Sequence, residues 1–550
     1  MNRRPDMKKP LVLIVMIVCG LNCVRGFAQP KLMAQTKSTA RAESTAQTKS
    51  TAESTAQTKS TAKVKSVASA NAQKPNVIFI YADDLGYGEL GCYGQTKIKT
   101  PNLDRMAREG MRFTQSYTST PVCAPARCML MTGRHGGKSY IRGNYELGGF
   151  RDEEEGGQMP LPAGTFTVAQ MFKNAGYVTG AIGKWGLGMQ NNSGNPNKHG
   201  FDYFYGYLDQ KQAHNFYPTH LWENGKQDKL NNPFIAVHTK LDINENDPAA
   251  FDKFKGKEYS LDKMVEKTMK FISENKQKPF FLYLPYTGPH VSLQAPDEAV
   301  KEYADKFDDT PYRGQKGYAS TLYPRATYAA MITYMDKQIG KILDTIKKLG
   351  LDDNTIIMFS SDNGATFDVG GVETEFFNSV GGLRGRKQEL YEGGIRIPFI
   401  ARWPGKIATN KTSDFVTVQY DFMATMCELT GSKTPETDGI SFLPTLLGQN
   451  DRQRQREFLY FEFPERTGQV AIRIGDMKGV KSNLKKNPNA PWEIYDIKND
   501  RNETKDLSSS HPELIKKFDT ILQKEHQNSH IREWEFINPK FKTAQELKLN

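Results

Sequence analysis

Two pairs of oxygen-bearing side chains stand directly after apolar runs of the sequence. The first pair is Asp83 and Asp84, and the second is Asp362 and Asn363. Carboxylate and amide oxygens are the ligands that calcium and magnesium prefer, whereas zinc favours histidine and cysteine. Either pair alone could be a helix cap or a tight turn. Because each pair ends a separate apolar run, the sequence favours a site for a hard divalent cation.

Cys123 begins a second group of chemically reactive residues, in the segment Cys-Ala-Pro-Ala-Arg. Pro125 suits the first turn of a helix, so we expect a helix from here to about Thr132. The first turn of a helix carries partial positive charge and free amide donors, which attract an anion. Arg127, one turn further on, adds to this positive field. Alone, Cys123 could be an inert residue at a helix start, so its meaning depends on its neighbours.

Three further polar side chains lie where a site would form. Lys184 and His290 follow apolar runs, and Lys387 lies in a basic stretch shortly before the segment Tyr-Glu-Gly-Gly at 391–394. Either lysine could equally be a solvated loop residue. Ligand sites in open α/β sheets lie beyond the carboxyl ends of the strands, so we expect Lys184 and His290 to converge with the two acidic pairs.

Strand-like and helix-like segments alternate from about residue 74 to residue 450. The runs expected to be buried strands are 76–82, 178–182, 279–285, 355–360 and 397–402. Helical patterns occupy 103–109, 168–175, 261–275 and 326–349. This alternation predicts an α/β fold with a largely parallel sheet. From 451 to 550, short strands followed by a helix near 512–526 predict a smaller C-terminal α+β subdomain.

The first 73 residues differ in character from the rest. Four basic residues precede the apolar run 11–18, and Gly-Phe-Ala at 26–28 offers a cleavage pattern, so residues 1–28 are predicted to be a secretory signal peptide. Cys19 and Cys23 lack the small preceding residues of a lipid-attachment site. Residues 29–73 contain AQTKSTA three times and almost no large apolar residue, which predicts a disordered tether. We therefore expect export to the periplasm or beyond.

Charge and cysteine content restrict the class of protein. The formal net charge of the 550 residues is +12, which suits anionic partners, but no nucleic-acid-binding motif is present. No stretch after the signal peptide is long and apolar enough to predict a membrane span. Four cysteines remain after the signal peptide, and their spacing resembles neither a disulfide scaffold nor a zinc site.

The motifs resemble those of the formylglycine-dependent sulfatases of the alkaline phosphatase superfamily. In that family Cys-x-Pro-x-Arg, followed by Leu-x-Thr-Gly-Arg, marks the cysteine that a maturation enzyme oxidises to formylglycine, and residues 123–134 match it. Further matching segments are 83–88, 100–104, 183–185, 361–364 and 391–394, with 495–496 and 506–507 in the C-terminal part. The resemblance runs from about Asn76 to Asp506. It implies an alkaline-phosphatase-like fold, with a mixed, mostly parallel sheet between helices.

The resemblance also implies roles for individual residues. It assigns Ca²⁺ to the set Asp83, Asp84, Asp362, Asn363 and the modified Cys123. It assigns contacts with formylglycine, sulfate or the leaving oxygen to the set Arg127, Lys184, His290 and Lys387. The chemistry is consistent with these roles, since a hydrated aldehyde supplies an oxygen nucleophile and cations neutralise the sulfate oxygens. A histidine can protonate the departing sugar oxygen.

One position departs from the family pattern. Many members have Gly-Lys-Trp-His, with a histidine assigned to the collapse of the sulfated intermediate, but here the segment ends in Gly186. His214 is interpreted as its replacement or as a substrate-binding residue, although a surface-loop histidine is equally compatible. Nearby aromatic residues form either a sugar-facing wall or part of the core: Phe216, Tyr217 and Trp222.

The sequence therefore predicts a hydrolase of sulfate esters on a sulfated carbohydrate, with galactose or N-acetylgalactosamine sulfate as the favoured sugars. Two alternatives stay open. One is a phosphate or phosphonate ester hydrolase of the same superfamily. The other is a non-catalytic protein that binds sulfated glycans, for which the glycine at position 186 is the only support.

Overall fold

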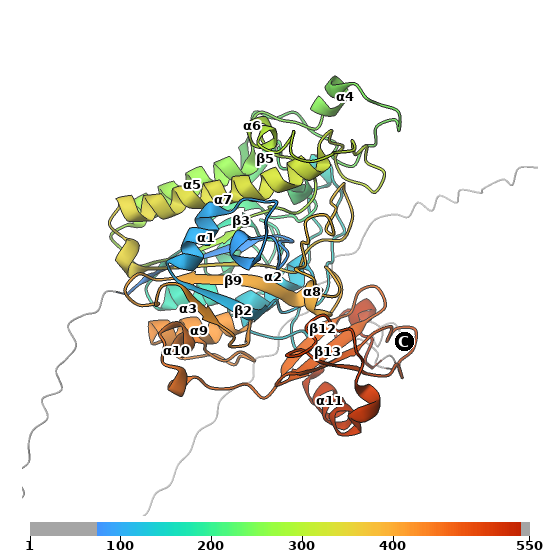
Figure 1. Ribbon diagram of the computed structural model, residues 1–550. Helices are drawn as coiled ribbons and strands as arrows, with labels where there is room; N and C mark the ends of the chain where they lie inside the picture. The colour runs from blue at the N-terminus through green and yellow to red at the C-terminus, as the bar shows by residue number, and fades with distance from the viewer. Residues whose placement is uncertain (1–73, 539, 541–550) are drawn as a thin grey trace, which may run out of the picture. The chain divides into compact units, whose positions relative to one another are not determined.

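Figure 1 shows a computed structural model of the chain, which describes residues 74–538 and 540. The predicted signal peptide (1–28) and tether (29–73) lie outside the described residues. Within the described part, no helix has the length and apolar character that crossing a membrane requires.

A large mixed sheet forms the centre of the described chain. Its strands follow the order β10-β2-β9-β8-β1-β7-β3-β4-β5-β6, and β11 also pairs with β2. The bounds are β1 (Asn76–Ala82), β2 (Met111–Tyr117), β3 (Val178–Lys184), β4 (Tyr203–Tyr207), β5 (His220–Glu223), β6 (Lys226–Lys229), β7 (Phe280–Pro285), β8 (Thr355–Ser361), β9 (Arg396–Arg402), β10 (Lys411–Ser413) and β11 (Thr417–Val418). The adjacent strands β8, β1, β7, β3 and β4 are parallel, whereas β9, β5 and β6 run antiparallel to their neighbours. The predicted mostly parallel sheet is confirmed.

Strand β1 shows why the central runs lack polar alternation. All seven of its residues are buried. Ile78 and Ile80 join the apolar cluster on one face of the sheet, and Val77, Phe79 and Tyr81 join the cluster on the other. Helices cover both faces, so both sets of side chains leave water. Each buried side chain of this size stabilises the fold by about 1.5–3 kcal/mol.

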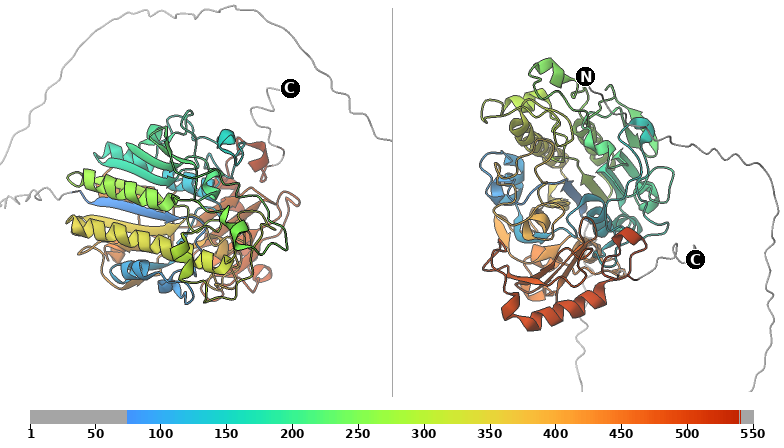
Figure 2. Two further views of the ribbon diagram at one scale, coloured as in Figure 1. Left: turned by 90° about the horizontal axis from the view of Figure 1, so that it is seen from above. Right: turned by 90° about the vertical axis from the view of Figure 1, so that its right-hand side faces the viewer.

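The helices divide between the two faces of the sheet, as Figures 1 and 2 show, with α5 and α7 on one face and α2, α3 and α9 on the other. The helices before the C-terminal sheet are α1 (Pro101–Arg108), α2 (Cys123–Thr132), α3 (Val168–Asn174), α4 (Pro248–Asp252), α5 (Ser260–Asn275), α6 (Asp297–Lys301), α7 (Pro324–Lys348), α8 (Glu392–Ile395), α9 (Asp421–Thr430) and α10 (Leu443–Leu446). Helix α2 begins at Cys123 and ends at Thr132, as predicted. Gly133 stops it in the left-handed conformation, at φ +68°.

A second, antiparallel sheet follows in the C-terminal part. Its strands are β12 (Leu459–Phe463), β13 (Gln469–Ile474), β14 (Met477–Lys481) and β15 (Glu493–Asp496), in that order. Helix α11 (Pro512–Glu525) places Phe518 and Leu522 in an apolar cluster with Ile472 of β13 and with Trp492, which directly precedes β15. The smaller C-terminal α+β unit is therefore confirmed, while the exact boundary near residue 450 stays a prediction.

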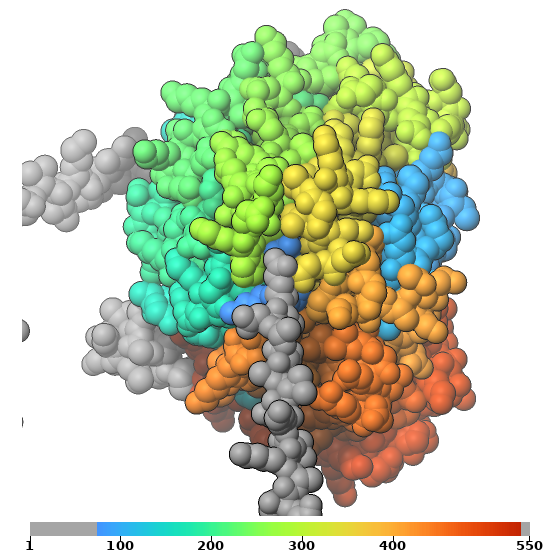
Figure 3. Space-filling model, turned by 90° about the vertical axis from the view of Figure 1, so that its left-hand side faces the viewer, coloured from blue at the N-terminus to red at the C-terminus, as the bar shows by residue number. Residues whose placement is uncertain are grey.

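The candidate site residues lie at the carboxyl ends of the parallel strands. Figure 3 shows the side at which β1 begins, the amino end of the strand. The residues singled out for chemistry lie at or after the opposite ends: Lys184 ends β3, and Asp83 and Asp362 directly follow β1 and β8.

Candidate active site

Neighbouring parallel strands bring the predicted residues to one place. Strands β8, β1, β7 and β3 lie next to one another, and Ala82 pairs with Ser361. The residues that come next, Asp83 and Asp362, therefore leave adjacent strands at the same edge. His290 arrives from the segment after β7, and Lys184 ends β3. The expected convergence of these side chains is what the structure shows.

Cys123 lies in the middle of this group. Its Sγ is 3.4 Å from Asp83 Oδ1 and 3.4 Å from Lys387 Nζ, and the residue is 2% exposed. Burial raises the pKa of the Cys123 thiol well above its usual range, and the nearby Asp83 carboxylate adds to the effect. A thiolate is the reactive form of cysteine. The unmodified side chain is therefore held protonated and is poorly suited to act as a sulfur nucleophile.

Arg127 binds two carboxylates behind the cysteine. One of its terminal nitrogens lies 2.8 Å from Asp362 Oδ2 and 3.2 Å from Asp83 Oδ2, and the other donates to the backbone oxygen of Lys184 at 2.7 Å. Lys184 Nζ reaches Asp83 Oδ2 at 2.7 Å. Burial acts to raise the pKa of Asp83, but Lys184, His290 and Arg127 hold it below its ordinary value. Burial and the neighbouring Asp83 raise the pKa of Asp362 to about 7.

Asn363 carries the clearest sign of an unsatisfied ligand atom. Its Nδ2 donates to Asp84 Oδ1 at 2.7 Å, while its own Oδ1 is buried and has no hydrogen-bond partner. Lys387 Nζ also lies 2.7 Å from Asp84 Oδ1. Buried acceptors are rarely left unpaired, because desolvation costs about 1–3 kcal/mol. An oxygen atom of this kind among carboxylates fits a hard cation.

The geometry of the side chains agrees with a metal site. Ligand atoms of Asp83, Asp84, Cys123 and His290 all lie within 4.8 Å of one another. Asp362 and Asn363 adjoin them through the contacts with Arg127 and Asp84 given above. This donor set is dominated by oxygen, as the sequence predicted.

His290 lies at the edge of the carboxylate group. Its Nε2 is 3.7 Å from Asp84 Oδ2, and its Nδ1 lies 2.5 Å from the backbone oxygen of Val291. Burial and the Lys387 charge lower the pKa of His290 to about 4, against an opposing effect of Asp84 and Asp83. Nδ1 must carry the proton to donate to the carbonyl, so Nε2 is the nitrogen that can exchange a proton with a bound molecule.

The structure places His214 directly beside His290. Their rings stack with centroids 5.0 Å apart and an interplanar angle of 21°. His214 Nδ1 also lies 3.3 Å from His238 Nε2, and the His238 ring is 3.9 Å from that of Phe150. Tyr318 adds a further ring 5.1 Å from His214. Sequence reasoning missed His238, Phe150 and Tyr318, because no motif marks them. By contrast, Phe216, Tyr217 and Trp222 are buried in the apolar clusters and belong to the core.

Comparison with known proteins decides the family. A family model described as Sulfatase matches residues 75–432, and one described as N-sulphoglucosamine sulphohydrolase, C-terminal, matches residues 386–528. The chain belongs to the sulfatase family.

Individual relatives agree with this assignment. The sulfatase is 29% identical over 516 residues to the N-acetylgalactosamine-6-O-sulfatase of Bacteroides thetaiotaomicron, covering 82% of this chain and 93% of the relative. It is 32% identical over 389 residues to the N-acetylgalactosamine-6-sulfatase of Rattus norvegicus, covering 69% and 67%. The solved structure of Ps i-CgsB in complex with k-i-k-neocarrahexaose matches with a TM-score of 0.67 at 27% identity, covering 87% of this chain and 96% of that one.

The backbone conformation of Gly186 in this sulfatase suits a glycine. Its φ is +72°, a conformation that favours glycine, and a β-carbon there would lie 3.0 Å from Cγ of Gln210. The Gln210 side chain thus occupies space beside position 186. No sequence signal pointed to Gln210, because the contact depends on the path of the loop after β4.

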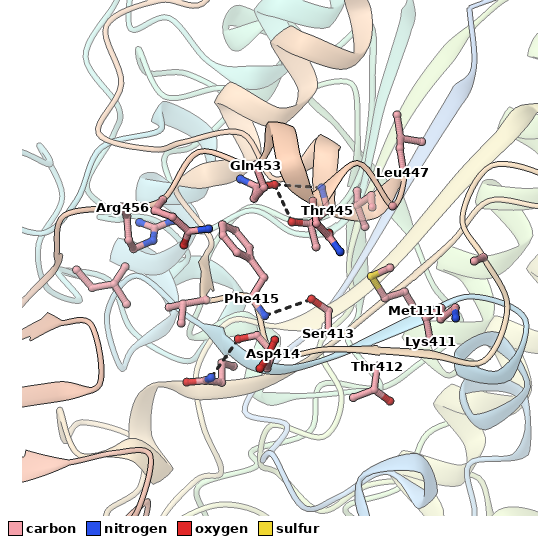
Figure 4. A pocket seen from close by; sticks show the side chains of 18 of the residues that line it. Met111, Lys411, Thr412, Ser413, Asp414, Phe415, Thr445, Leu447, Gln453 and Arg456 are labelled. Atoms are coloured by element: carbon pink, nitrogen blue, oxygen red, sulfur yellow. Dashed lines mark hydrogen bonds between the residues drawn. The ribbon is translucent and has the colours of Figure 1, made fainter.

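A cavity lies elsewhere in the sulfatase, away from the residues described above. It measures about 810 Å³, and residues around it include Phe415, Thr445, Gln453 and Arg456, as Figure 4 shows. None of the residues predicted to bind the metal or the sulfate lines it. Cavity size therefore does not locate the chemistry in this fold.

Proposed function

We propose that this sulfatase hydrolyses sulfate esters of a sulfated glycan, with formylglycine at position 123 and Ca²⁺ as its metal. One observation carries the proposal. Cys123 lies at the first turn of α2, in contact with Asp83 and Lys387, next to a buried oxygen cluster in which Asn363 Oδ1 lacks a partner. This arrangement supplies the surroundings that an oxygen nucleophile and a hard cation need.

The environment of Cys123 favours its conversion. The thiol is held protonated, so an unmodified Cys123 would be a weak sulfur nucleophile. A hydrated aldehyde at this position would supply an oxygen nucleophile. Residues 123–134 carry the recognition pattern for the maturation enzyme that we expect as a partner.

Calcium fits the oxygen donors that surround the cysteine. The residues that would hold it are Asp83, Asp84, Asp362 and Asn363, with the modified side chain of residue 123. When bound there, the cation would draw negative charge from neighbouring oxygens and lower the pKa of a hydroxyl nucleophile.

The cationic side chains of the chain can stabilise the sulfate group itself. Lys184 and Lys387 contact carboxylates on two sides of Cys123, and burial does not neutralise them, because Asp83 and Asp84 raise their pKa values. Fixed positive charge in a water-poor site stabilises charge that builds up on the sulfate oxygens.

His290 is the residue placed to protonate the departing sugar oxygen. The Val291 carbonyl fixes its Nδ1, which leaves Nε2 for proton transfer. In the described state Nε2 lacks a proton, since burial lowers the pKa of the ring. A bound sulfate ester brings negative charge, which raises the pKa of a nearby histidine and favours the acid form.

A sugar substrate is supported by the rim of the site and by the relatives. Phe150 and Tyr318, both partly exposed, contact His214 and His238 and offer ring faces to a sugar. Two relatives are named for N-acetylgalactosamine 6-sulfate hydrolysis, and a related structure holds k-i-k-neocarrahexaose. We propose that the sugar unit hydrolysed within the glycan is N-acetylgalactosamine 6-sulfate or galactose 6-sulfate. We also propose that the enzyme is exported.

Two measurements test this function. Mass spectrometry of the peptide that contains residue 123 should show a loss of about 18 Da relative to cysteine, as expected when an aldehyde replaces the thiol. Hydrolysis of 4-nitrophenyl sulfate should exceed that of 4-nitrophenyl phosphate, and Cys123→Ala should abolish it. Faster phosphate hydrolysis would support the phosphoesterase alternative. A fully converted protein inert on sulfated sugars and aryl sulfate would support the binding protein instead.

A further inference from the structure

Two buried acceptor atoms near the site have no hydrogen-bond partner and no role in the function proposed so far. They are Oε1 of Gln210, a residue only 4% exposed, and Oε1 of Glu146. Native structures pair nearly all buried polar atoms, so each such atom calls for an explanation. Two such acceptors on neighbouring loops indicate a binding site for a molecule that carries hydrogen-bond donors.

Gln210 is linked to the nucleophile position by short contacts. Its Nε2 lies 3.4 Å from Asn144 Oδ1, and the same oxygen accepts from the backbone nitrogen of Ala124 at 3.2 Å. Ala124 directly follows Cys123. On its other side, Gln210 packs against Gly186, two residues after Lys184. The amide nitrogen is thus committed to Asn144, while the amide oxygen stays free beside the sulfate-binding residues.

Glu146 lies on the same loop as Asn144. Burial and, to a smaller extent, Asp209 raise the pKa of Glu146 to about 7, against an opposing effect of the Lys184 charge. Asp209 is itself fully buried and precedes Gln210 in the chain. The backbone oxygen of Glu146 lies 3.5 Å from Lys211 Nζ, so Glu146 adjoins the segment that carries Gln210.

The chemistry of these atoms selects the kind of group that can bind. Gln210 Oε1 is an acceptor, and Glu146 Oε1 is one when its carboxyl group is deprotonated, so each then needs a donor. A sulfate or carboxylate has no proton to donate near neutral pH and cannot satisfy Gln210 Oε1. A sugar hydroxyl donates a hydrogen bond and carries no charge. Ordered water can satisfy the two atoms in the free enzyme and leave when a hydroxyl arrives.

We propose that Gln210 and Glu146 form a subsite for a free sugar hydroxyl next to the sulfate ester, and that this subsite disfavours sugar units sulfated at that neighbouring position. The inference rests on the proposed glycan sulfatase function and adds a specificity to it. Asn144 is the positioning residue of the subsite, because it fixes the Gln210 amide and joins it to the start of α2.

The test compares three substrates with and without the relevant hydroxyl. These are N-acetylgalactosamine 6-sulfate, its 4,6-disulfate and 4-nitrophenyl sulfate. Gln210→Leu removes the acceptor with little change in volume, and Glu146→Gln removes the charge. Each is expected to lower kcat/KM for the monosulfate by about ten- to a hundredfold, the range for a lost hydrogen bond to a substrate. Hydrolysis of the aryl sulfate should stay within about twofold of wild type.

A binding measurement separates recognition from chemistry. Calorimetric titration of N-acetylgalactosamine 6-sulfate into calcium-loaded Cys123→Ala protein should show weaker binding when Gln210→Leu or Glu146→Gln is added. The matched control is Gln170→Leu, which changes a glutamine of α3 that bonds to Asn174. It should leave binding unchanged.

The possible results distinguish a failure of the subsite from a failure of the catalytic proposal. Equal losses on the monosulfate and the aryl sulfate would show that the pair supports the nucleophile and would overturn the subsite. So would wild-type hydrolysis of the disulfate as fast as the monosulfate. If wild type cleaves the aryl sulfate but binds no sugar sulfate, the subsite falls while sulfatase chemistry stands. If wild type lacks aryl sulfatase activity yet binding responds to the variants, the subsite stands and the catalytic proposal fails.

Discussion

Asn363 donates from Nδ2 to Asp84 Oδ1 at 2.7 Å, and its own Oδ1 faces no partner within the buried site. The hydrogen bond fixes the orientation of the amide, so the free oxygen is held rather than rotating between alternatives. Nearby lie the carboxylates of Asp83 and Asp362, which form ion pairs with Lys184 and Arg127. A bound cation would give the free oxygen of Asn363 its missing partner.

This relationship predicts a calcium dependence of stability that Asn363→Leu reduces. Wild type in excess calcium should unfold at a higher temperature than chelated protein, because a ligand at about 100 times its Kd stabilises the fold by about 2.7 kcal/mol. Asn363→Leu should show a smaller calcium shift and little sulfatase activity. Asn489→Leu, at an exposed asparagine, is the control and should keep the full shift. Identical melting of wild type with and without calcium would argue against the site.

Restoring the family histidine is expected to harm this enzyme. At Gly186 the backbone is left-handed and a β-carbon would crowd Gln210, so Gly186→His and Gly186→Ala should both lower stability and activity. The backbone alone accounts for about 1–2 kcal/mol. Gly350→Ala isolates this cost, since Gly350 has φ +69° with nothing within 4 Å. Urea denaturation should show a larger loss for Gly186→Ala than for Gly350→Ala. A Gly186→His enzyme as active as wild type would refute the crowding.

The acidic part of the site could be predicted from sequence because strand geometry determines it. Strands β1 and β8 are adjacent and parallel, and their last residues, Ala82 and Ser361, pair. The residues after them must therefore lie side by side, whatever the loops do. The same rule applies to Lys184 at the end of β3, so several apolar runs that each end in a polar residue predicted the convergence, although one such run alone would not have done so.

The rest of the site depends on loop paths, which short-range patterns do not determine. Gln210, Asn144 and Glu146 carry no motif, and their contacts join residues far apart in sequence, 66 positions in the case of Gln210 and Asn144. His214 could be singled out as a histidine, but its stacking on His290 could not. The aromatic residues after His214 suggested a sugar-facing wall, yet Phe216 and Tyr217 pack inward, because their segment closes over the apolar cluster on the α5 and α7 face.

His290→Gln should affect substrates in proportion to how poorly their alcohol leaves. A sugar oxygen needs a proton as the bond to sulfur breaks, whereas 4-nitrophenolate is a stable anion. General acid catalysis contributes about 10²–10⁴-fold, so the variant should lose this factor on a sugar sulfate and much less on 4-nitrophenyl sulfate. His511→Gln, at the start of α11, is the control and should change neither rate. Equal losses on both substrates would assign His290 to binding the metal or sulfate instead.

His526 should make the stability of the C-terminal part depend on pH. Its Nδ1 lies 2.8 Å from Glu462 and its Nε2 lies 3.1 Å from Glu535, while Arg142 is also near Glu462. Burial opposes the charged form, but hydrogen bonds from the ring to Glu462 and Glu535 prevail and raise the pKa of His526 to about 9.

The folded-state pKa lies above the ordinary histidine pKa of about 6.5. The charged ring therefore contributes its full stabilisation below pH 6.5, and this stabilisation is lost as the pH rises through about 9. The contribution is on the order of 2–3 kcal/mol. The free energy of unfolding in urea should therefore fall between pH 6.5 and pH 9.5 by more in wild type than in His526→Gln. Parallel pH profiles for the two proteins would show that the ring is not charged between the two glutamates.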